Sequence, residues 1–542
     1  MAKPVRTVGF DFGTSTSLVA EGIPGRPISI VPLGVATRSM PSWVGIGDQG
    51  VVSGEAAQDL PLSVVARSVK RAITRRWTTV PLEANPEVNL NADEAIRCVL
   101  REMGNRARDR GVVLTDDSVR LGCPAMWTSQ QRNRLLRLTR EAGVPASDHT
   151  LVDEPIAAGV AWVSHRVDRF GDRLKGRLLV FDMGGGTLDV ALLDVEAGPR
   201  ATPEISVLAS SGLDEAGDRL DAAIAGDLAQ MYGDLGIEID GYGDATLAAV
   251  ILHEARRVKE ILSASPSAVV APRHPTITLP SLTYTREQLE TAFEAQLRNA
   301  TRLVEAVLRE SLLTNERHPS PEGARALPLS ALQHEVRYVL LVGGMSQIPI
   351  VARRLGDIFA SASVYDDAGV RPDEAIVAGL ADTAGYERIN LHRPGFDFVL
   401  DWPGQDGLPM YEAFTPFYPW WMAMQRSELY YEHTIRARHL PSSGSGMLKI
   451  RSSGGSDIAL RIDGTDSPGM PVQFGHRDVM LRMYPNGRVV LCDGRGRQHP
   501  IKINKWPMLR GMNHAVLVAE RISAVRPEDP ELPYPHGSRD TK

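Results

Sequence analysis

Two acidic, glycine-rich turns, each placed directly after an apolar strand-like run, constrain this chain more than any other feature. The first turn lies in VGFDFGTSTS at residues 8–17, and the second lies in VFDMGGGTLD at residues 180–189. In each tract a strand would carry a carboxylate to its end, at Asp11 and at Asp182. Such a carboxylate can hold Mg²⁺ through water, while glycines let the backbone approach phosphate oxygens and hydroxyls donate to them.

One such turn alone is equally typical of an ordinary β-hairpin. Two copies about 170 residues apart, each followed by a further strand, instead predict duplicated halves that face each other. Neither copy fits GxxxxGK[ST] or GxGxxG, which excludes a Walker-type phosphate loop and a dinucleotide fingerprint. A third glycine turn, LVGGMS at residues 341–346, follows another strand-like run, and its backbone can lie flat against a nucleoside.

Composition limits the class of protein. The chain has 542 residues, 43% hydrophobic and 23% charged, with a net charge of −6 and interleaved signs. This length predicts two or three folding units, and the lack of a basic stripe argues against nucleic-acid binding. Three scattered cysteines indicate a reducing cytoplasm, with neither a disulfide framework nor a metal knuckle. No signal-peptide core or membrane-spanning run is expected, so we predict a cytoplasmic protein without a membrane partner.

The hydrophobic pattern predicts mixed secondary structure in the first three quarters of the chain. Strands are expected at 5–12, 17–20, 118–123, 177–182 and 338–342, and helices at 93–110 and about 129–143. Ser129 is the expected N-cap of the second helix, and Gly143 its C-terminal glycine. Thr285 and Gln288 form a capping-box pattern ahead of another helix. The Pro- and Gly-rich patch at 315–327 is typical of a surface insertion.

The sequence pattern changes near residue 386. Residues 396–522 consist of short β-type runs separated by turn dipeptides, without a long helix, and Asn486-Gly487 between two apolar runs predicts a hairpin. The predicted plan is a nucleotide-binding domain at 1–386, a linker at 387–395, a small β domain at 396–525 and a disordered tail at 526–542.

Seven tracts, in order, resemble the heat-shock chaperones of the 70 kDa class, within the superfamily of actin, sugar kinases and chaperone ATPases: DFGTSTS, VKRAI, PAMWTSQQR, VDEPIAAGVAW, FDMGGGTLDV, LLVGGMSQIP and PDEAIVAGLA. The resemblance is collinear over residues 5–386, and the SVKRAITRR tract at 68–76 favours the chaperone branch. It implies an α/β fold of duplicated actin-like, ribonuclease H-like halves, followed by a small all-β, sandwich-like domain with no helical lid.

The resemblance also implies roles for individual residues. Asp11 and Asp182 would orient hydrated Mg²⁺, and Lys70 would neutralise charge on the transferred phosphate. Glu154 and Asp189 would position or deprotonate the attacking water. Without the neighbouring motifs, the residues favour the interpretation of Lys70 as a solvated lysine in a basic patch, and Glu154 can be interpreted as a helix cap ahead of a proline.

The remaining implied residues surround the nucleotide. Thr187 would hydrogen-bond the γ-phosphate, and Pro124 with Arg132 would relay the nucleotide state toward the linker, although Pro124 would also serve simply to end a strand. The implied nucleotide contacts are Gly13, Thr14, Ser15, Gly184, Gly185, Gly186, Gly217, Lys259, Ser263, Gly343, Gly344, Ser346 and Asp373.

Three residues depart from the family on the adenosine side. Arg256 stands where an acidic residue is frequent, and Glu260 and Gln347 stand where arginine is common. These departures leave the phosphate chemistry intact but put the contact with adenine, and therefore nucleotide affinity, in question.

The C-terminal tracts are similar to the family's peptide-binding β-sandwich in pattern only. The tract at 478–503 matches its last hairpins, and 447–452 and 457–463 are candidate earlier strands. Phe396–Trp402 is either linker or first strand. The aromatic stretch at 414–421 is either a groove for an extended apolar peptide or, with greater weight, the core of a small domain.

We therefore expect a slow ATPase that uses ATP or ADP and Mg²⁺, with K⁺ as a further candidate, and that couples nucleotide state to binding of a polypeptide. The alternative is an ATPase switch or scaffold that docks one dedicated protein partner without general chaperone activity. A small-molecule kinase is disfavoured by the Lys70 tract and the β domain, and filament formation has no supporting feature. An exchange factor and a J-domain-type co-chaperone are left open.

Overall fold

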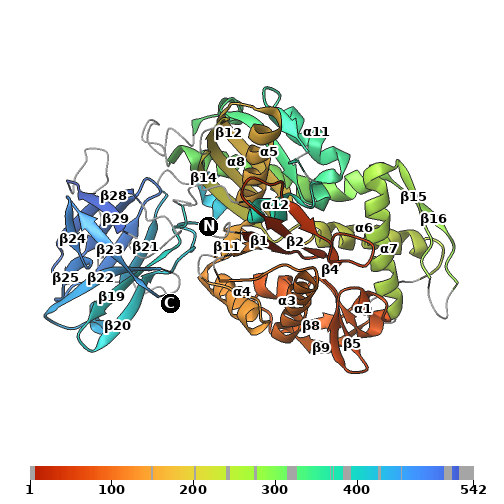
Figure 1. The fold of residues 1–542 in the computed structure, drawn as a ribbon, viewed down its shortest axis with the longest axis horizontal. Helices are drawn as coiled ribbons and strands as arrows, with labels where there is room; N and C mark the ends of the chain where they lie inside the picture. Colours follow the sequence, from red (N-terminus) through yellow and green to blue (C-terminus); the bar gives the residue numbers. More distant parts are fainter. Residues whose placement is uncertain are drawn as a thin grey trace. The chain divides into compact units, whose positions relative to one another are not determined.

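The computed structural model describes residues 6–116, 118–147, 150–199, 203–237, 239, 245–273, 278–313, 326–366, 368–369, 371–382, 392–424, 429–452, 455–505 and 516–523. The chain forms two compact units (Figure 1). The first unit comprises residues 1–206, 210–307 and 328–386, and the second comprises 207–209, 308–327 and 387–542.

Two mixed sheets form the centre of the first unit. The first sheet runs in the order β11 (Leu151–Asp153), β10 (Val119–Cys123), β1 (Thr7–Phe12), β2 (Thr16–Gly22) and β3 (Ser29–Val31), with β4 (Met40–Pro41) beside β2. The second runs in the order β18 (Ser363–Tyr365), β17 (Val336–Val342), β12 (Leu174–Met183), β13 (Leu188–Ala197) and β14 (Glu204–Leu213). In each sheet one strand, β1 or β12, carries the first aspartate of a glycine turn. That strand has an antiparallel neighbour on one side and a parallel neighbour on the other. The repeated order confirms the predicted duplication.

Helices α5 (Glu154–Phe170) and α12 (Ala375–Ala381) pack against each other beside the two sheets. A Cβ placed on Gly379 would lie 1.7 Å from the carbonyl oxygen of Ala157, so only glycine permits this approach of two backbones. A Cβ on Gly9 would lie 2.7 Å from Leu380 Cβ, which brings β1 equally close to α12. Because these contacts are made by backbone and small side chains, they fix the distance between the two halves.

The other elements of the first unit surround this core. Its remaining helices are α1 (Glu55–Gln58), α2 (Arg71–Thr74), α3 (Ala92–Asp109), α4 (Ser129–Glu141), α6 (Gly217–Gly233), α7 (Ala245–Ala264), α8 (Arg286–Leu313, with its end in the second unit), α10 (Leu329–Gln333), α11 (Pro349–Ile358) and the 3₁₀ turns η1 (Leu62–Val64) and η2 (Gly344–Gln347). Small sheets join β5 (Val44–Gly47), β6 (Gly50–Ser53) and β7 (Val65–Ala66), then β8 (Thr79–Leu82) and β9 (Asn85–Asn91), and β15 (Ser267–Val270) and β16 (Leu282–Thr285).

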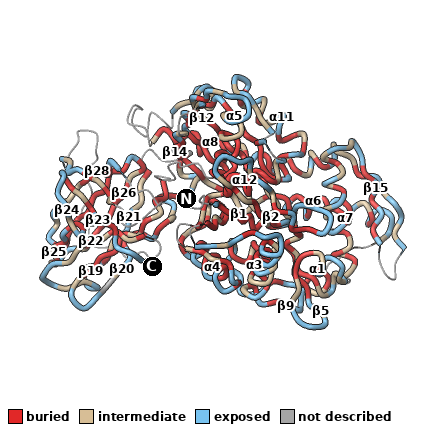
Figure 2. Tube along the Cα trace, viewed as in Figure 1, coloured by how far each residue is buried: buried red, intermediate tan, exposed pale blue. Residues whose placement is uncertain are grey.

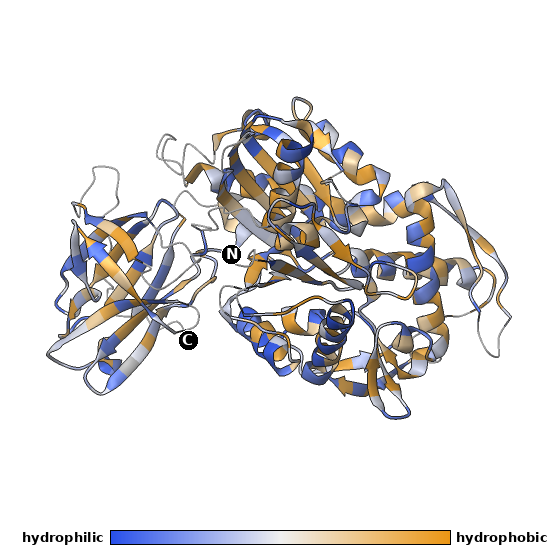
Figure 3. Ribbon diagram, viewed as in Figure 1, coloured by the Kyte–Doolittle hydropathy of each residue, from blue (hydrophilic) through white to orange (hydrophobic). Residues whose placement is uncertain are grey.

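Burial follows the hydrophobic pattern. All six residues of β1 and the last six of β12 are buried, and Figure 2 shows buried residues concentrated along the central strands. Figure 3 shows hydrophobic residues along the same strands, while α3 and α4 present hydrophilic residues outward. Continuous apolar strands are expected where both faces of a sheet are covered. Among the described residues, no helix is both long and apolar enough to span a bilayer.

The second unit is a single large sheet. Its strands follow the order β20 (Gln405–Tyr411), β19 (Phe396–Trp402), β22 (Ser445–Ser452), β23 (Asp457–Ile462), β29 (Val516–Arg521), β28 (Gln498–Lys505), β27 (Arg488–Cys492), β26 (Val479–Met483) and β21 (Tyr431–Ile435), with β24 (Thr465–Ser467) and β25 (Met470–Gln473) at the side. The Tyr431 hydroxyl on β21 donates to the Met410 carbonyl on β20 at 2.9 Å, which links the two ends of this strand path. The sheet is therefore a nearly closed sandwich. Besides the end of α8, the helical elements among its described residues are the short turns η3 (Trp420–Met424) and η4 (Ala437–His439), with no helical lid among them.

Several local predictions can now be compared with the structure. Thr128, not Ser129, is the N-cap of α4, because Thr128 has extended backbone and forms a capping box with Gln131; Ser129 is already helical. Gly143 follows the helix with a φ of 79°, as predicted. The amide nitrogen of Gln288 donates to the Thr285 hydroxyl at 3.3 Å, which confirms the second capping box.

In the second unit, Asn486-Gly487 connects β26 to β27 as the predicted hairpin, and Phe396–Trp402 is a strand. The aromatic stretch contributes Phe417 and Tyr418 to the core, whereas Trp421 is exposed. The predicted insertion at 315–327 lies almost wholly outside the described residues, and the predicted tail at 526–542 lies wholly outside them.

A buried carboxyl group lies in the second unit, near the end of α8. Burial raises the pKa of Glu310 to about 8, against the opposing charge of Arg393. His392 is also buried, its Nδ1 lies 2.6 Å from the Tyr418 hydroxyl, and burial lowers its pKa to about 3. The folded state therefore holds a proton on Glu310 and none on His392 at neutral pH.

We predict that Glu310 makes stability fall with pH above neutrality. Its raised pKa contributes stability that is complete below about pH 4.5 and is lost as pH rises through about 8, while above pH 6.5 His392 is neutral in both states. Between pH 6.5 and 8 the melting temperature of the wild type should fall by about 2–4 °C per pH unit more than that of Glu310→Gln. Scanning calorimetry of the full chain measures this, with exposed Glu287→Gln on the same helix as control; equal slopes in all three proteins would contradict it.

Candidate functional site

The two acidic glycine turns meet in the first unit, as the duplication predicts. A Cβ on Gly185 would lie 2.6 Å from Ser15 Oγ, and one on Gly186 would lie 2.8 Å from Thr14 Oγ1. Gly13 closes the first turn so tightly that a Cβ there would lie 2.1 Å from the Thr16 carbonyl. Glycine at these positions leaves backbone amides and hydroxyls of both turns facing one narrow space, an arrangement suited to phosphate oxygens.

Four buried carboxylates surround this space. Asp11 is the last residue but one of β1, Asp182 pairs with Asp189 across β12 and β13, and Glu154 begins α5. Burial and the neighbouring carboxylate of Glu154 raise the pKa of Asp11 to about 7 and that of Asp189 to about 7, and they raise the pKa of Asp182 well above its ordinary range. The direction is the one expected when like charges are buried together.

Lys70 provides the opposing charge. Its ammonium donates to Glu154 Oε1 at 2.6 Å, and both side chains are buried. Burial disfavours the charged ammonium, but Glu154 and Asp11 outweigh this effect, so the pKa of Lys70 is raised. The interpretation of Lys70 as a solvated lysine is therefore wrong. Glu154 does lie in the first turn of its helix, but its carboxylate is also paired with Lys70.

The surplus of negative charge in this space indicates whether a divalent cation would fit there. Asp11 and Asp182 are buried close to Glu154 and Asp189, and Lys70 is the cation that opposes the raised pKa values of Asp11, Asp182 and Asp189. Carboxylate oxygens are ligands that Mg²⁺ accepts, directly or through water. The residues present therefore fit a magnesium ion, with Asp11 and Asp182 as its nearest carboxylates.

The third glycine turn adjoins the second. Gly343 has a φ of 83° and a ψ of 157°, a conformation essentially restricted to glycine. A Cβ at this position would lie 2.4 Å from the Met183 carbonyl oxygen and 2.8 Å from Asp182 Oδ1. The absence of a side chain at Gly343 therefore lets Asp182 occupy its position, in addition to any contact with a nucleoside.

Helices α6 and α7 form the opposite wall. The amide nitrogens of Gly217 and Asp218 donate to the Gly184 and Gly185 carbonyls at 3.1 and 2.7 Å, which ties the start of α6 to the second turn. Lys259 on α7 bonds Asp221 on α6 at 2.6 Å, and the Ser263 hydroxyl donates to the Lys259 carbonyl at 3.2 Å.

These walls enclose a cavity of about 450 Å³. Most of the predicted site residues line it: Asp11, Gly13, Thr14, Ser15, Lys70, Glu154, Asp182, Gly184, Gly185, Gly186, Thr187, Lys259, Ser263, Gly343, Gly344 and Asp373. The cavity runs from the buried carboxylates to the ends of α7 and η2, so a ligand with an anionic end and a broader end would fit along it.

Five predicted residues lie outside the lining. Asp189 is held behind it by the Ala125 amide at 2.8 Å, next to Pro124, and Arg132 bonds Asp153 at 2.6 Å, beside Glu154. Gly217 supports the second turn, and the Ser346 hydroxyl bonds the Val342 carbonyl at 2.5 Å. Pro124 and Arg132 thus adjoin residues that contact the site, whereas Ser346 is directed to backbone.

Arg371 is a lining residue that the sequence analysis missed. Its guanidinium forms two hydrogen bonds to Asp373, at 3.0 and 2.8 Å, at the end of the cavity where Glu260 and Gln347 also lie. Its place two residues before Asp373, in the tract preceding α12, was the available signal.

Comparisons with known proteins agree with this geometry. The family model for the Hsp70 protein matches residues 7–390. "Chaperone protein DnaK" of Thermosipho africanus is 27% identical over 403 residues, which cover 72% of this chain and 61% of the relative. The protein of the same name from Deinococcus proteolyticus is 30% identical over 405 residues, covering 70% and 59%. The matched region thus spans about three fifths of the length of these relatives.

Two adjacent glycines provide a matched test of the turn geometry. We predict that Gly343→Ala, without nucleotide, costs about 1–3 kcal/mol of stability, because its conformation and the Met183 carbonyl both exclude a side chain. Gly344→Ala should be close to neutral, since a Cβ there meets nothing within 4 Å. Urea unfolding of the two variants measures the difference, and equal midpoints would refute this account of the turn.

Proposed function

The chain belongs to the Hsp70 family, and on that basis we propose that it binds ATP with Mg²⁺ and hydrolyses it slowly. The observation that carries this proposal is the buried Lys70–Glu154 pair beside Asp11 and Asp182, where two glycine turns meet. A structural ion pair alone would not need four buried carboxylates around one lysine, because uncompensated buried charge is costly. A divalent cation would bring the positive charge that this arrangement lacks, and a triphosphate would supply further oxygen ligands to that ion.

The proposed mechanism is electrostatic positioning, as phosphoryl transfer to water requires. Asp11 and Asp182 would hold Mg²⁺ through water, and the ion would neutralise charge on the β- and γ-phosphates. Thr14, Ser15 and Thr187 would donate to phosphate oxygens. Lys70 would stabilise the developing charge, with K⁺ as a further candidate cation.

The attacking water would be held between the two acidic residues flanking Lys70. Glu154 is fixed by its 2.6 Å bond to Lys70, and Asp189 by the Ala125 amide at 2.8 Å. Glu154 would accept a hydrogen bond from the water, and Asp189, which lies behind the lining, would assist in positioning or deprotonating it, since its raised pKa suits a group that takes a proton near neutral pH.

The adenosine would lie toward the ends of α7 and η2, against Lys259, Ser263, Gly344 and Asp373. Arg256 does not enter that wall. It is 2.9 Å from Glu83 and 3.4 Å from Asp221, so it supports the cavity through its ion pairs. Arg371 would supply a guanidinium near the base, at the end of the cavity where Glu260 and Gln347 replace the frequent arginines.

We further propose a division of labour along the chain. Residues 1–386 would bind and hydrolyse the nucleotide, 387–395 would connect, and 396–525 would bind a polypeptide in a manner set by the nucleotide, in the cytoplasm. Pro124 and Arg132 would relay the nucleotide state, because Pro124 precedes Ala125, whose amide bonds Asp189, and Arg132 bonds Asp153, which precedes Glu154. An exchange factor and a J-domain-type co-chaperone are candidates for the reaction's regulation.

We predict that Lys70→Ala and Asp182→Asn each lower the rate of phosphate release from radiolabelled ATP by about 10²–10³-fold, because each removes a charge that acts on the transferred phosphate. Lys175→Ala, in an exposed surface pair with Glu196, should leave the rate unchanged. Melting temperatures of all four proteins control for folding. Unchanged hydrolysis in both site variants would show that the site is assigned wrongly.

The nature of the polypeptide partner is predicted to be general. A pull-down with wild type and Lys70→Ala, each in ATP and in ADP, should recover many heterogeneous proteins whose amounts differ between the two nucleotides only for the wild type. Recovery of one stoichiometric protein would instead establish the switch or scaffold with a dedicated partner. Recovery that ignores the nucleotide in both proteins would reject the coupling.

A further inference from the structure

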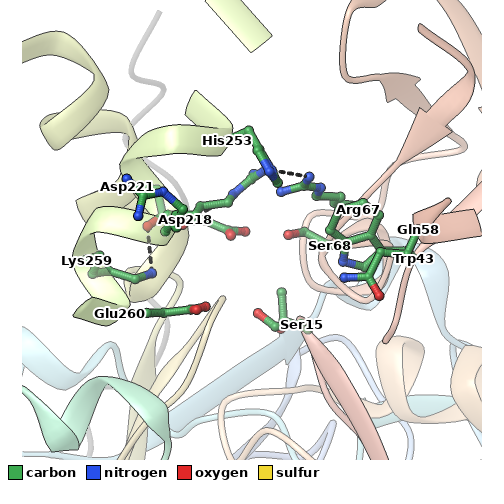
Figure 4. A pocket seen from close by; sticks show the side chains of 13 residues that line it. Ser15, Trp43, Gln58, Arg67, Ser68, Asp218, Asp221, His253, Lys259 and Glu260 are labelled. Carbon is green, nitrogen blue, oxygen red and sulfur yellow. Dashed lines mark hydrogen bonds and ion pairs between the residues drawn. The ribbon is translucent and has the colours of Figure 1, made fainter. Parts of the chain in front are cut away.

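A second cavity lies beside the phosphate turns. It has a volume of about 210 Å³ and shares Thr14 and Ser15, as well as Lys259 and Glu260, with the nucleotide cavity. Figure 4 shows side chains from α7 on one side and from the segment before α2 on the other enclosing this space. None of the roles proposed above for the nucleotide requires this second cavity.

Arg67 is the unusual group in it. The residue is nine-tenths buried, with a relative exposure of 9%, and its guanidinium stacks on the Trp43 ring at 3.6 Å. Its Nη2 donates to His253 Nδ1 at 2.8 Å, a bond that Figure 4 shows closing one side of the pocket. A guanidinium stacked on an indole keeps its N–H donors at its edge, in the plane of the group.

Those donors are not matched by an acceptor of opposite charge. Among the described residues, Arg67 Nε has no hydrogen-bond partner and no carboxylate lies within ion-pair distance of Arg67. Burial and the nearby charge of Arg256 lower the pKa of Arg67 to about 10. A buried arginine without a carboxylate is unfavourable by itself, and an anion beside it would relieve the cost.

Two of the three acidic groups around the pocket are already engaged, and the third, Glu260, also lines the nucleotide cavity. Asp218 accepts a bond from Arg71 at 3.1 Å, and Asp221 bonds Lys259 at 2.6 Å. Four side chains that are always cationic line the pocket against three carboxylates, and burial and Arg67 lower the pKa of His253, which keeps its ring neutral. Among the four cationic side chains, Arg67 is therefore the one without a carboxylate partner in the described part of the chain.

Hydroxyl donors complete the lining. Ser68 has a φ of 51°, a conformation that costs a non-glycine residue free energy and that is found preferentially at functional sites. Its hydroxyl and that of Ser15 face the same space in Figure 4. A planar guanidinium with neighbouring hydroxyls is the donor set that binds phosphate oxygens well.

We propose that this pocket binds the phosphate group of a second, small anion next to the nucleotide, with Arg67 as its main ligand. Two sources supply such a group: orthophosphate released by hydrolysis, which has only to pass Thr14 and Ser15, and a free phosphate ester that enters from solvent. The proposal requires the nucleotide cavity only as a neighbouring space. Phosphate binding in this pocket can therefore be tested independently of whether the protein hydrolyses ATP.

The test is calorimetric titration of inorganic phosphate into protein saturated with Mg²⁺ and the non-hydrolysable β,γ-imido analogue of ATP, which fills the γ-phosphate position. Wild type should bind one phosphate, and Arg67→Gln should weaken that binding by at least about tenfold, since it removes a charge-assisted contact. Arg257→Gln is the matched control, because Arg257 lines the same pocket but is 42% exposed and already paired with Glu254. Arg67→Lys keeps the charge without the planar donor edge and should give an intermediate affinity.

Each outcome is decisive. Absence of phosphate binding to the wild type, or equal weakening by Arg67→Gln and Arg257→Gln, overturns the proposal. Binding of the analogue is measured first; if it fails, the proposed function fails, and phosphate is titrated into the nucleotide-free protein. There, binding that is lost in Lys70→Ala but kept in Arg67→Gln belongs to the nucleotide cavity and overturns the second site.

A parallel titration with glycerol 3-phosphate distinguishes the sources. Binding of inorganic phosphate alone supports the pocket as a binding site for the orthophosphate that hydrolysis releases. Binding of the ester at equal or higher affinity, with the same dependence on Arg67, supports a site for an external phosphorylated ligand.

Discussion

The structure of the first unit depends on the burial of several carboxylates around one ammonium group. Asp11, Asp182 and Glu154 approach one another because three chain segments end at the same place, and Lys70 alone does not balance them. Such an arrangement is costly in a folded protein unless a cation completes it. We attribute this arrangement to a bound ligand and its metal ion rather than to packing. The raised pKa values of Asp11 and Asp182 reflect the cost of burying these carboxylates close together.

Glycine makes this convergence geometrically possible. Gly379 lets α5 and α12 touch through their backbones, and Gly9 brings β1 to the same helix pair. The separation of the halves is thereby set by backbone contacts, which cannot adjust as side chains do. Gly185 and Gly343 then let the turns interlock within that separation. A substitution at any of these positions would therefore move a carboxylate, even where the residue itself touches no ligand.

The sequence alone was sufficient to predict that the two acidic turns face each other, because each turn is a local pattern and its duplication predicts the facing partner. The 2.6 Å pairing of Lys70 with Glu154 joins residues 84 positions apart and followed only from resemblance. The sequence placed Arg256 among the residues that put the adenine contact in question, whereas its guanidinium pairs with the Glu83 carboxylate, 173 residues away. In the β domain, hairpins such as β26–β27 were predictable from turn dipeptides. The parallel pairing of β23 with β29 was not, because no local pattern encodes it.

The distribution of charged groups suggests how nucleotide binding and cleft closure are connected. Lys70, Glu154 and Asp11 belong to the half built on the first sheet, while Asp182 and Asp189 belong to the half built on the second. Around the rim, ion pairs such as Arg71–Asp218 and Arg256–Glu83 also cross between the halves, but they are partly solvated and can break singly. The Lys70–Glu154 pair, which we propose to be catalytic, lies within one half and would survive opening. A ligand that engages Asp11 and Asp182 together would add a link between the halves at their buried ends, beside the backbone contact of α5 with α12, so we expect the metal-bound phosphates, rather than the rim, to favour the closed state.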